Sequence, residues 1–420
     1  MEKIIVRGGR KLQGEVDISI AKNSVLPIIV ATILNPTEII LKKVPMLEDV
    51  TVLINLLREL NCEVQFSSIT GDLKINTLNL KKVDPNSELI RKMRASFLVM
   101  GPMLARFGRC KISMPGGCNI GSRPVDLHLK GFKSLGIESE IGYGYVEAKV
   151  DKLHGNRIYL DFPSVGATEN IMMAAILAPG ITVIENAAEE PEIWDLARFL
   201  NSMGAKIEGA GYGKITIHGV SQLKQPEPFT PIFDRIEAGT FMVAAGITNS
   251  KITINGVNEE HLMPTIEKLK ECGVYCSIDG QKMIVDGTQE KKPVDIKTMP
   301  YPGFPTDMQA QIMALLSITR GVSVITETVF ENRFMHVGEL GRMGANIKID
   351  GRIAIVEGVS TLTGCEVKAT DLRAGAAMIL AGLVANGETE IGEVYHIDRG
   401  YTNIEEKFKK LGAEIYRIHK

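Results

Sequence analysis

Met203-Gly204-Ala205-Lys206-Ile207 is the stretch that decides the fold, because versions of it recur along the chain about every 70 residues. Each copy follows an amphipathic run such as Ile404, Phe408 and Leu411, a spacing that predicts a surface helix. The glycine predicts a left-handed cap at the end of that helix, and the apolar residues after it predict a strand. In the first copy Asn61 replaces Gly, and Asn is the next best residue at such a cap. The other copies lie at residues 60–64, 135–137, 272–274, 343–347 and 411–415.

A second element, a helix of small and apolar residues followed by a strand, also occurs six times. These helices are apolar nearly all round, which predicts that they are buried. Three strand–helix units in each of two domains is the simplest partition, and the proline-rich segment 225–231 is its natural boundary. The same periodicity would fit a non-enzymatic ring or clamp. The six helices lie at residues 21–34, 93–107, 167–178, 237–247, 307–318 and 371–385.

Composition argues against several classes of protein. Hydrophobic residues make up 45% of the 420, and the net charge is −2 with the basic residues spread out, so a nucleic-acid partner is not expected. The N-terminal residues 1–7 lack a signal-peptide core, and the longest apolar stretch, 374–385, is shorter than the ~20 residues that span a bilayer. Six cysteines without a CxxC pair predict free thiols, a cytoplasmic location and no metal site. No cofactor of another kind is expected.

The glycine-rich segment 114–124 breaks the repeat pattern. Three glycines surround Cys118, and Arg123 follows five residues later, which predicts a mobile loop that presents a thiol beside a cation. An adjacent arginine favours the thiolate, so Cys118 should be more reactive than the other five cysteines, whose periodic segments predict a core location. A loop cysteine that merely caps the core is the alternative. A cysteine phosphatase loop is disfavoured, because it needs five residues between Cys and Arg and here there are four.

Four further segments carry polar residues of interest. Lys22 opens a buried helix, where its charge opposes the helix dipole unless an anion binds there. Asp307, after Thr306, precedes another apolar helix and is either an N-cap residue or a functional carboxylate. Arg399 lies in a turn that contains Gly400 and is expected to be buried. His128 is interpreted as structural, and residues 407–410 as a solvated helix face.

Taken together, these segments resemble the UDP-N-acetylglucosamine enolpyruvyl transferase family along the whole chain. The resemblance implies an α/β fold in the form of a two-domain inside-out α/β barrel with six repeated strand–helix units, three per domain. It places residues 21–230 in one domain and residues 1–20 with 231–420 in the other. The matching motifs are Lys22-Asn23 and residues 93–96, 116–128, 164–168, 304–311, 326–336 and 396–401.

The resemblance implies transfer of enolpyruvyl from phosphoenolpyruvate to the 3′-hydroxyl of UDP-N-acetylglucosamine, with release of phosphate. It makes Cys118 the proton donor and the target of fosfomycin, and Asp307 the acceptor of the sugar hydroxyl proton. Phosphoenolpyruvate is doubly anionic, and Lys22, Arg123 and Arg399 are the cations assigned to it. The substrate contacts that the resemblance implies are Lys22, Asn23, Arg94, Arg123, Pro124, Val125, Asp126, Leu127, Ser164, Val165, Gly166, Asp307 and Val329.

Two rival functions stay open. Enolpyruvyl transfer to shikimate-3-phosphate uses the same fold, but its family lacks the Gly-Gly-Cys loop that this chain carries. A non-catalytic paralogue that binds a sugar nucleotide would not need Lys22, Cys118, Asp307 and Arg399, and all four are present.

Overall fold

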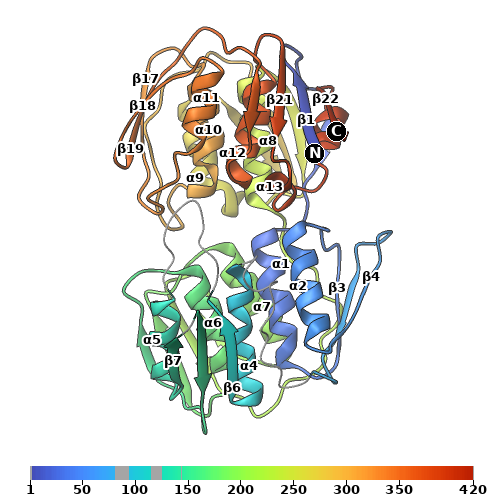
Figure 1. Cartoon of the computed structure of the whole chain (residues 1–420), viewed down its shortest axis with the longest axis vertical. Helices are drawn as coiled ribbons and strands as arrows, with labels where there is room; N and C mark the ends of the chain where they lie inside the picture. The colour runs from blue at the N-terminus through green and yellow to red at the C-terminus, as the bar shows by residue number, and fades with distance from the viewer. Residues whose placement is uncertain (1, 81–93, 115–124, 143, 420) are drawn as a thin grey trace. The chain divides into compact units, whose positions relative to one another are not determined.

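The computed structural model describes residues 2–80, 94–114, 125–142 and 144–419. The chain forms two compact units. Unit 1 contains the residues up to Ser19 and those from Phe233 on, and unit 2 contains the described residues between Ile20 and Ile232. Figure 1 shows both, with helices and strands labelled. Within the described ranges, no helix combines the length and apolar character needed to cross a membrane.

Unit 2 alternates buried helices, amphipathic helices and small sheets. Its buried helices are α1 (Lys22–Ala31), α4 (Met100–Phe107) and α6 (Val165–Ala175). The 3-10 helix η1 (Thr32–Leu34) follows α1, and the 3-10 helix η2 (Arg94–Val99) precedes α4. Its amphipathic helices are α2 (Glu48–Glu59), α5 (Asp126–Ser134) and α7 (Pro191–Ser202). Its described sheets have the orders β3 (Glu38–Leu41), β5 (Leu73–Asn76), β4 (Glu63–Phe66); β6 (Arg109–Ser113), β8 (Tyr145–Lys149), β7 (Glu138–Gly142); and β11 (Lys206–Glu208), β12 (Lys214–His218), β10 (Ile181–Glu185), β9 (Arg157–Tyr159).

Unit 1 repeats the same arrangement. Its buried helices are α8 (Arg235–Ile247), α10 (Gln309–Leu316) after η3 (Thr306–Met308), and α12 (Leu372–Gly382). Its other helices are α9 (Glu259–Glu271), α11 (His336–Arg342), α13 (Tyr395–Asp398) and α14 (Ile404–Lys410). Its described sheets have the orders β20 (Glu366–Lys368), β21 (Glu388–Gly392), β1 (Glu2–Arg7), β22 (Glu414–His419); β14 (Tyr275–Asp279), β15 (Lys282–Asp286), β13 (Lys251–Asn255), β2 (Glu15–Asp17); and β16 (Ile296–Lys297), β17 (Val322–Thr326), β19 (Ile353–Glu357), β18 (Asn346–Asp350).

The N-terminal strands complete sheets that otherwise come from the second half of the chain. Strand β1 lies between β21 and β22 and runs antiparallel to both, so that Val6 pairs with Thr389 on one side and Ile415 on the other. Strand β2 runs parallel to β13, with Val16 opposite Ile254. Pairings between such distant segments give no local periodic signal, and sequence periodicity therefore could not predict them.

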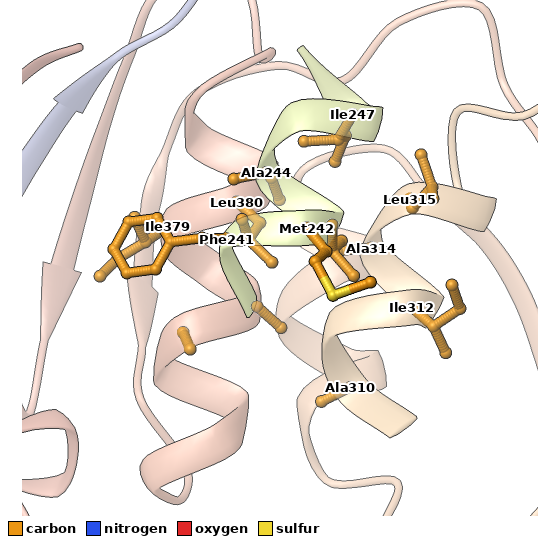
Figure 2. Close-up of a cluster of buried hydrophobic side chains, with 14 of the residues drawn as sticks. Phe241, Met242, Ala244, Ile247, Ala310, Ile312, Ala314, Leu315, Ile379 and Leu380 are labelled. Carbon is orange, nitrogen blue, oxygen red and sulfur yellow. The ribbon is translucent and has the colours of Figure 1, made fainter. Parts of the chain in front are cut away.

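Five of the six helices predicted to be buried are buried nearly throughout, as the sequence predicted, whereas α4 buries only residues 100–104. In unit 1, side chains of α8, α10 and α12 pack together in one buried cluster, part of which Figure 2 shows. Phe241, Met242 and Ile379 are each 0% exposed. A small residue on α8 also permits close approach of the segment before β14: a Cβ atom added at Gly246 would lie 2.7 Å from Cγ2 of Val274.

The predicted helix caps are confirmed at all six repeats. Asn61 has a φ angle of 66°, in the left-handed region that Asn tolerates better than most residues. The five glycines at the equivalent position have φ angles between 89° and 96°. They are Gly136, Gly204, Gly273, Gly344 and Gly412.

The expectation that residues 407–410 form a solvated face is wrong for Lys407. Its Nζ atom lies 2.7 Å from both Ser19 Oγ and Glu237 Oε1, and the Glu237 side chain is 2% exposed. Burial acts to raise the pKa of Glu237, and the charge of Lys407 acts against it. The buried carboxylate therefore draws this lysine inward, whereas Lys409 and Lys410 remain exposed.

Candidate active site

Two nearly buried arginines in unit 1 bind the carboxylate of Asp307. Nη2 of Arg333 donates to Oδ1 at 2.9 Å, while Nε and Nη2 of Arg373 donate to Oδ2 at 3.2 and 3.1 Å. The side chains of Arg333 and Arg373 are 4% and 2% exposed, and that of Asp307 is 27% exposed. Segments far apart in the chain thus meet here: η3, the turn before α11, and the first turn of α12.

The two guanidinium groups determine the ionisation of Asp307. Burial acts to raise the pKa of Asp307, but the charges of Arg373 and Arg333 and their hydrogen bonds outweigh it and hold that pKa well below its usual range. The carboxylate is therefore ionised at neutral pH and can accept a proton. It is a weak base while both arginines hold it.

The interpretation of Asp307 and Thr306 as N-cap residues is wrong. Neither η3 nor α10 has a side-chain cap hydrogen bond, and their N-cap residues are Pro305 and Met308. The oxygens of Asp307 bind the two arginines instead, since charge-assisted hydrogen bonds are stronger than bonds to neutral amides. The Thr306 hydroxyl donates to Oε2 of Glu327 at 2.9 Å.

A second layer of buried polar groups lies behind Asp307. Nε2 of Gln311 donates to the Asp307 carbonyl at 2.8 Å and lies 3.3 Å from the Tyr401 hydroxyl. That hydroxyl is 3.0 Å from Thr240 Oγ1, and the Arg373 guanidinium is 5.3 Å from the Tyr401 ring centre. Burial raises the pKa of Tyr401, so its hydroxyl stays neutral. This layer links α8, α10 and α12 and keeps Asp307 in place.

Arg399, a predicted phosphoenolpyruvate contact, follows directly after α13 and is half-buried. It lies two residues before Tyr401, whose hydroxyl belongs to the buried layer just described. Burial and the charge of Arg399 both lower the pKa of the neighbouring His396. Val329, another predicted contact, lies in the turn after β17 and is half-buried.

In unit 2, Lys22 pairs with an acidic residue that sequence reasoning missed. Its Nζ atom lies 2.7 Å from Oδ2 of Asp49, and the two side chains are 8% and 6% exposed. Lys22 begins α1, and Asp49 is the second residue of α2. The carboxylate offsets the unfavourable position of the lysine at a helix start. Asn23, the next predicted contact, is half-buried on α1.

The predicted sugar-nucleotide contacts on α5 and α6 are brought close together. Val125 and Asp126 stand at the start of α5, and Ser164 caps α6, where its hydroxyl accepts a 3.3 Å hydrogen bond from Ala167 N. A Cβ added at Gly166 would lie 3.3 Å from Cε1 of His128 on α5. The first turn of α6 offers backbone N–H groups of the kind that bind phosphate oxygens.

His128 has the structural contacts predicted for it. Its Nδ1 atom lies 3.1 Å from Nδ2 of Asn170, and its ring packs edge-on against Phe97 at 5.0 Å. Asn170 in turn accepts from Gly101 N at 2.6 Å and donates to Phe97 O at 3.1 Å. These bonds orient the Asn170 amide, so its NH₂ group donates to Nδ1 of His128. The proton of a neutral His128 is then on Nε2.

Several predicted residues cannot be placed. Cys118, Arg123 and Pro124 lie outside the described residues, as does the side chain of Arg94, whose backbone opens η2. The remaining cysteines are free, and they are buried or half-buried. Burial raises the pKa of Cys62 and Cys276 to about 12 and that of Cys272 to about 11, so these thiols stay protonated and unreactive. The remaining free cysteines are Cys110 and Cys365.

Sequence signals for the missed site residues differ in strength. Arg373 is the single charged residue in the otherwise apolar helix α12, an anomaly that could have identified it. Arg333 lies within the motif at residues 326–336 but was not singled out. Asp49 gave no signal, because an acidic residue in the first turn of an amphipathic helix is ordinary.

Comparison with known proteins identifies the family. Residues 6–408 match the family described as EPSP synthase (3-phosphoshikimate 1-carboxyvinyltransferase). The chain is 65% identical over 418 residues to UDP-N-acetylglucosamine 1-carboxyvinyltransferase 2 of Clostridium tetani and 63% identical over 418 residues to UDP-N-acetylglucosamine 1-carboxyvinyltransferase 1 of Clostridium acetobutylicum, with 100% of each chain covered.

Solved structures share the fold. The enolpyruvyl transferase NikO from Streptomyces tendae superposes with a TM-score of 0.89 at 23% identity, covering 99% of this chain and 98% of that one. An EPSP synthase from Acinetobacter baumannii gives a TM-score of 0.74 at 18% identity, with 100% of both chains covered. These likenesses confirm the predicted fold class. The chain belongs to the UDP-N-acetylglucosamine 1-carboxyvinyltransferases, a family of enolpyruvyl transferases.

Proposed function

We propose that this chain transfers the enolpyruvyl group of phosphoenolpyruvate to the 3′-hydroxyl of UDP-N-acetylglucosamine and releases phosphate. The observation that carries the proposal is the 65% identity, over the whole chain, with a relative named for carboxyvinyl transfer to this sugar nucleotide. The ionised carboxylate of Asp307 is the group that the chemistry requires, since the sugar hydroxyl must lose a proton as its oxygen attacks.

The reaction proceeds by addition and elimination. The sugar oxygen forms a bond to C2 of phosphoenolpyruvate while Asp307 accepts the hydroxyl proton and Cys118 supplies a proton to C3. Lys22, Arg123 and Arg399 hold the phosphate and carboxylate groups, as the family resemblance suggests. The tetrahedral adduct then loses phosphate from C2 and a proton from C3, which restores the double bond.

Arg333 and Arg373 regulate the basicity of Asp307 in this proposal. Both guanidinium groups favour the ionised carboxylate, and this lowers its affinity for a proton. An anionic substrate group that also binds Arg333 or Arg373 weakens the interaction of that arginine with Asp307 and raises the pKa of Asp307. The base therefore becomes stronger when substrate is bound.

The same proposal covers the cellular role. The reaction is the first committed step of peptidoglycan precursor synthesis, which supports cell shape and division, and it would take place in the cytoplasm with the two small-molecule substrates as partners. The two compact units correspond in this proposal to the two enolpyruvyl transferase domains, with boundaries near residues 20 and 231.

Phosphate release separates the proposal from its rivals. Wild-type protein with phosphoenolpyruvate should release phosphate when UDP-N-acetylglucosamine is added and not when shikimate-3-phosphate is added. Asp307→Ala should lower the rate by about 10²- to 10⁴-fold, the usual contribution of a general base. Release with shikimate-3-phosphate alone would support the other transferase activity. Binding of UDP-N-acetylglucosamine without any phosphate release would support a non-catalytic protein.

A further inference from the structure

Glu327 is a buried carboxylate that the reaction above does not use. It follows β17 directly and is 1% exposed. Its Oε1 atom accepts hydrogen bonds from Thr298 Oγ1 at 2.8 Å, Val329 N at 2.8 Å and Phe330 N at 3.1 Å. Its Oε2 atom accepts one from Thr306 Oγ1 at 2.9 Å. The side chain thus connects the turn after β17 to the segment that carries Asp307.

All four hydrogen-bond donors to Glu327 are neutral. Within the described ranges, no lysine or arginine pairs with this carboxylate, although burying an ionisable group is costly. Its removal would leave two hydroxyls and two backbone N–H groups without their acceptor, so the carboxylate contributes to local stability. The two oxygens also bind different segments, Oε1 the turn after β17 and Oε2 the hydroxyl of Thr306. The carboxylate therefore holds that turn and the segment before Asp307 in one arrangement.

Comparison among the repeats shows that the fold does not require a buried carboxylate here. The residue after the equivalent strand in the other two sheets of unit 1 is Gly256 after β13 and Glu393 after β21. Both have left-handed backbone conformations, with φ angles of 82° and 58°, and Glu393 is exposed. Glu327 does not have a positive φ angle and its side chain turns inward. This position is specialised in the one repeat that contains Asp307.

We propose that Glu327 is a positioning residue for the sugar nucleotide. It fixes Val329, which the proposed function places against UDP-N-acetylglucosamine, and Thr306, which precedes the proposed base Asp307. The inference therefore rests on the proposed function. Loss of Glu327 should disturb the binding of the sugar nucleotide and the proton transfer from it, and leave the binding of phosphoenolpyruvate unchanged.

The experiment measures kcat and the KM of each substrate by phosphate release. For Glu327→Ala we expect the KM of UDP-N-acetylglucosamine to rise about tenfold and kcat to fall about tenfold, since small misplacements of substrate and base have effects of this size or larger. The KM of phosphoenolpyruvate should stay within about twofold. Glu327→Gln should recover most of the loss, because its carbonyl can serve the Oε1 donors and its NH₂ group can donate to the Thr306 hydroxyl.

Ser323→Ala is the matched control. Ser323 lies on the same strand, is 2% exposed, and accepts a hydrogen bond from Val294 N at 3.0 Å. Its loss should lower thermal stability and leave both KM values unchanged. If Glu327→Ala fails to fold, Thr306→Val removes one of the four bonds in a nearly isosteric way and should still lower kcat.

The outcomes separate the two proposals. An active wild type whose Glu327→Ala and Thr306→Val variants keep wild-type kinetics overturns the positioning role alone, as does an equal rise in both KM values. A wild type that releases no phosphate overturns the proposed function and this inference with it. A rise in KM that is confined to UDP-N-acetylglucosamine in Glu327→Ala, and that is largely absent in Glu327→Gln, supports the inference.

Discussion

Replacement of Asp307 by Asn tests whether the two arginines hold an ionised carboxylate. Asn keeps the size of the side chain and one acceptor oxygen, so the change is chiefly one of charge. Arg333 and Arg373, whose side chains are 4% and 2% exposed, would keep their positive charges without the anion that they share. The variant therefore leaves two buried cations without the carboxylate that they share, and only the more remote charge of Asp234 still acts on Arg373.

The magnitude follows from the burial and the distances. Two unit charges 4 Å apart interact by about 4 kcal/mol at an effective dielectric constant near 20, and removal of one partner from a buried pair costs about 3–5 kcal/mol. The N–O distances here are 2.9–3.2 Å. We expect a loss of about 3–5 kcal/mol in the free energy of unfolding at pH 7. For a unit of this size, that lowers Tm by about 10 °C.

The pH dependence has a definite sign. The pKa of Asp307 in the folded protein is below its value of about 4 in the unfolded chain. The stabilisation is therefore complete above about pH 5 and is lost as the pH falls through the folded pKa. The difference in stability between wild type and Asp307→Asn should be constant from pH 5 to pH 8 and should shrink below about pH 4.

Calorimetric scans of both proteins between about pH 3 and pH 8 measure this difference. Asp286→Asn is the control, because this more exposed carboxylate of the same unit accepts hydrogen bonds from Thr288 and has its nearest paired cation, Lys251, 3.8 Å away. It should change stability by about 0.5 kcal/mol or less. Equal stability of wild type and Asp307→Asn at pH 7, or a difference that widens between pH 7 and pH 4, would refute the reasoning.

Three further predictions follow from other parts of the chain. Fosfomycin should alkylate Cys118 and none of the buried thiols, as intact-mass and peptide mass spectrometry would show, and Cys118→Asp should keep some activity without the adduct. Lys22→Met should cost about 3–5 kcal/mol by removing the cation that pairs with the buried carboxylate of Asp49, whereas Lys22→Met/Asp49→Leu should regain much of the stability but not the activity; equal Tm values for the two variants would contradict this. Burial and the charge of Glu192 raise the pKa of Glu169 well above its usual range, so the wild type loses stability as the pH rises above about 4. Glu169→Gln should therefore match the wild type near pH 4 and exceed its Tm near pH 8, and a lower Tm at pH 8 would show that the carboxylate is ionised in the folded protein.

Much of the fold could be predicted from the sequence because its signals are local. A left-handed cap selects Gly or Asn one residue at a time, and all six predicted caps have positive φ angles, Asn61 among them. Apolar residues on every side predicted the buried helices, and in unit 1 α8, α10 and α12 form one core cluster. Lys407 shows where local patterns fail: its charged neighbours indicate a solvated face, but a buried carboxylate 170 residues away binds it.

For the candidate site, the sequence by itself predicted which residues carry the chemistry, and only the tertiary structure decided which of the described ones meet. Asp307 was identified from its motif, but its partners Arg333 and Arg373 lie 26 and 66 residues further along the chain. Asp49, which pairs with Lys22, and Glu327, which binds the turn at Val329, were likewise not found from the sequence. The reason is physical. Local backbone preferences are encoded residue by residue, whereas the contact between two charged side chains depends on how separate repeats pack together.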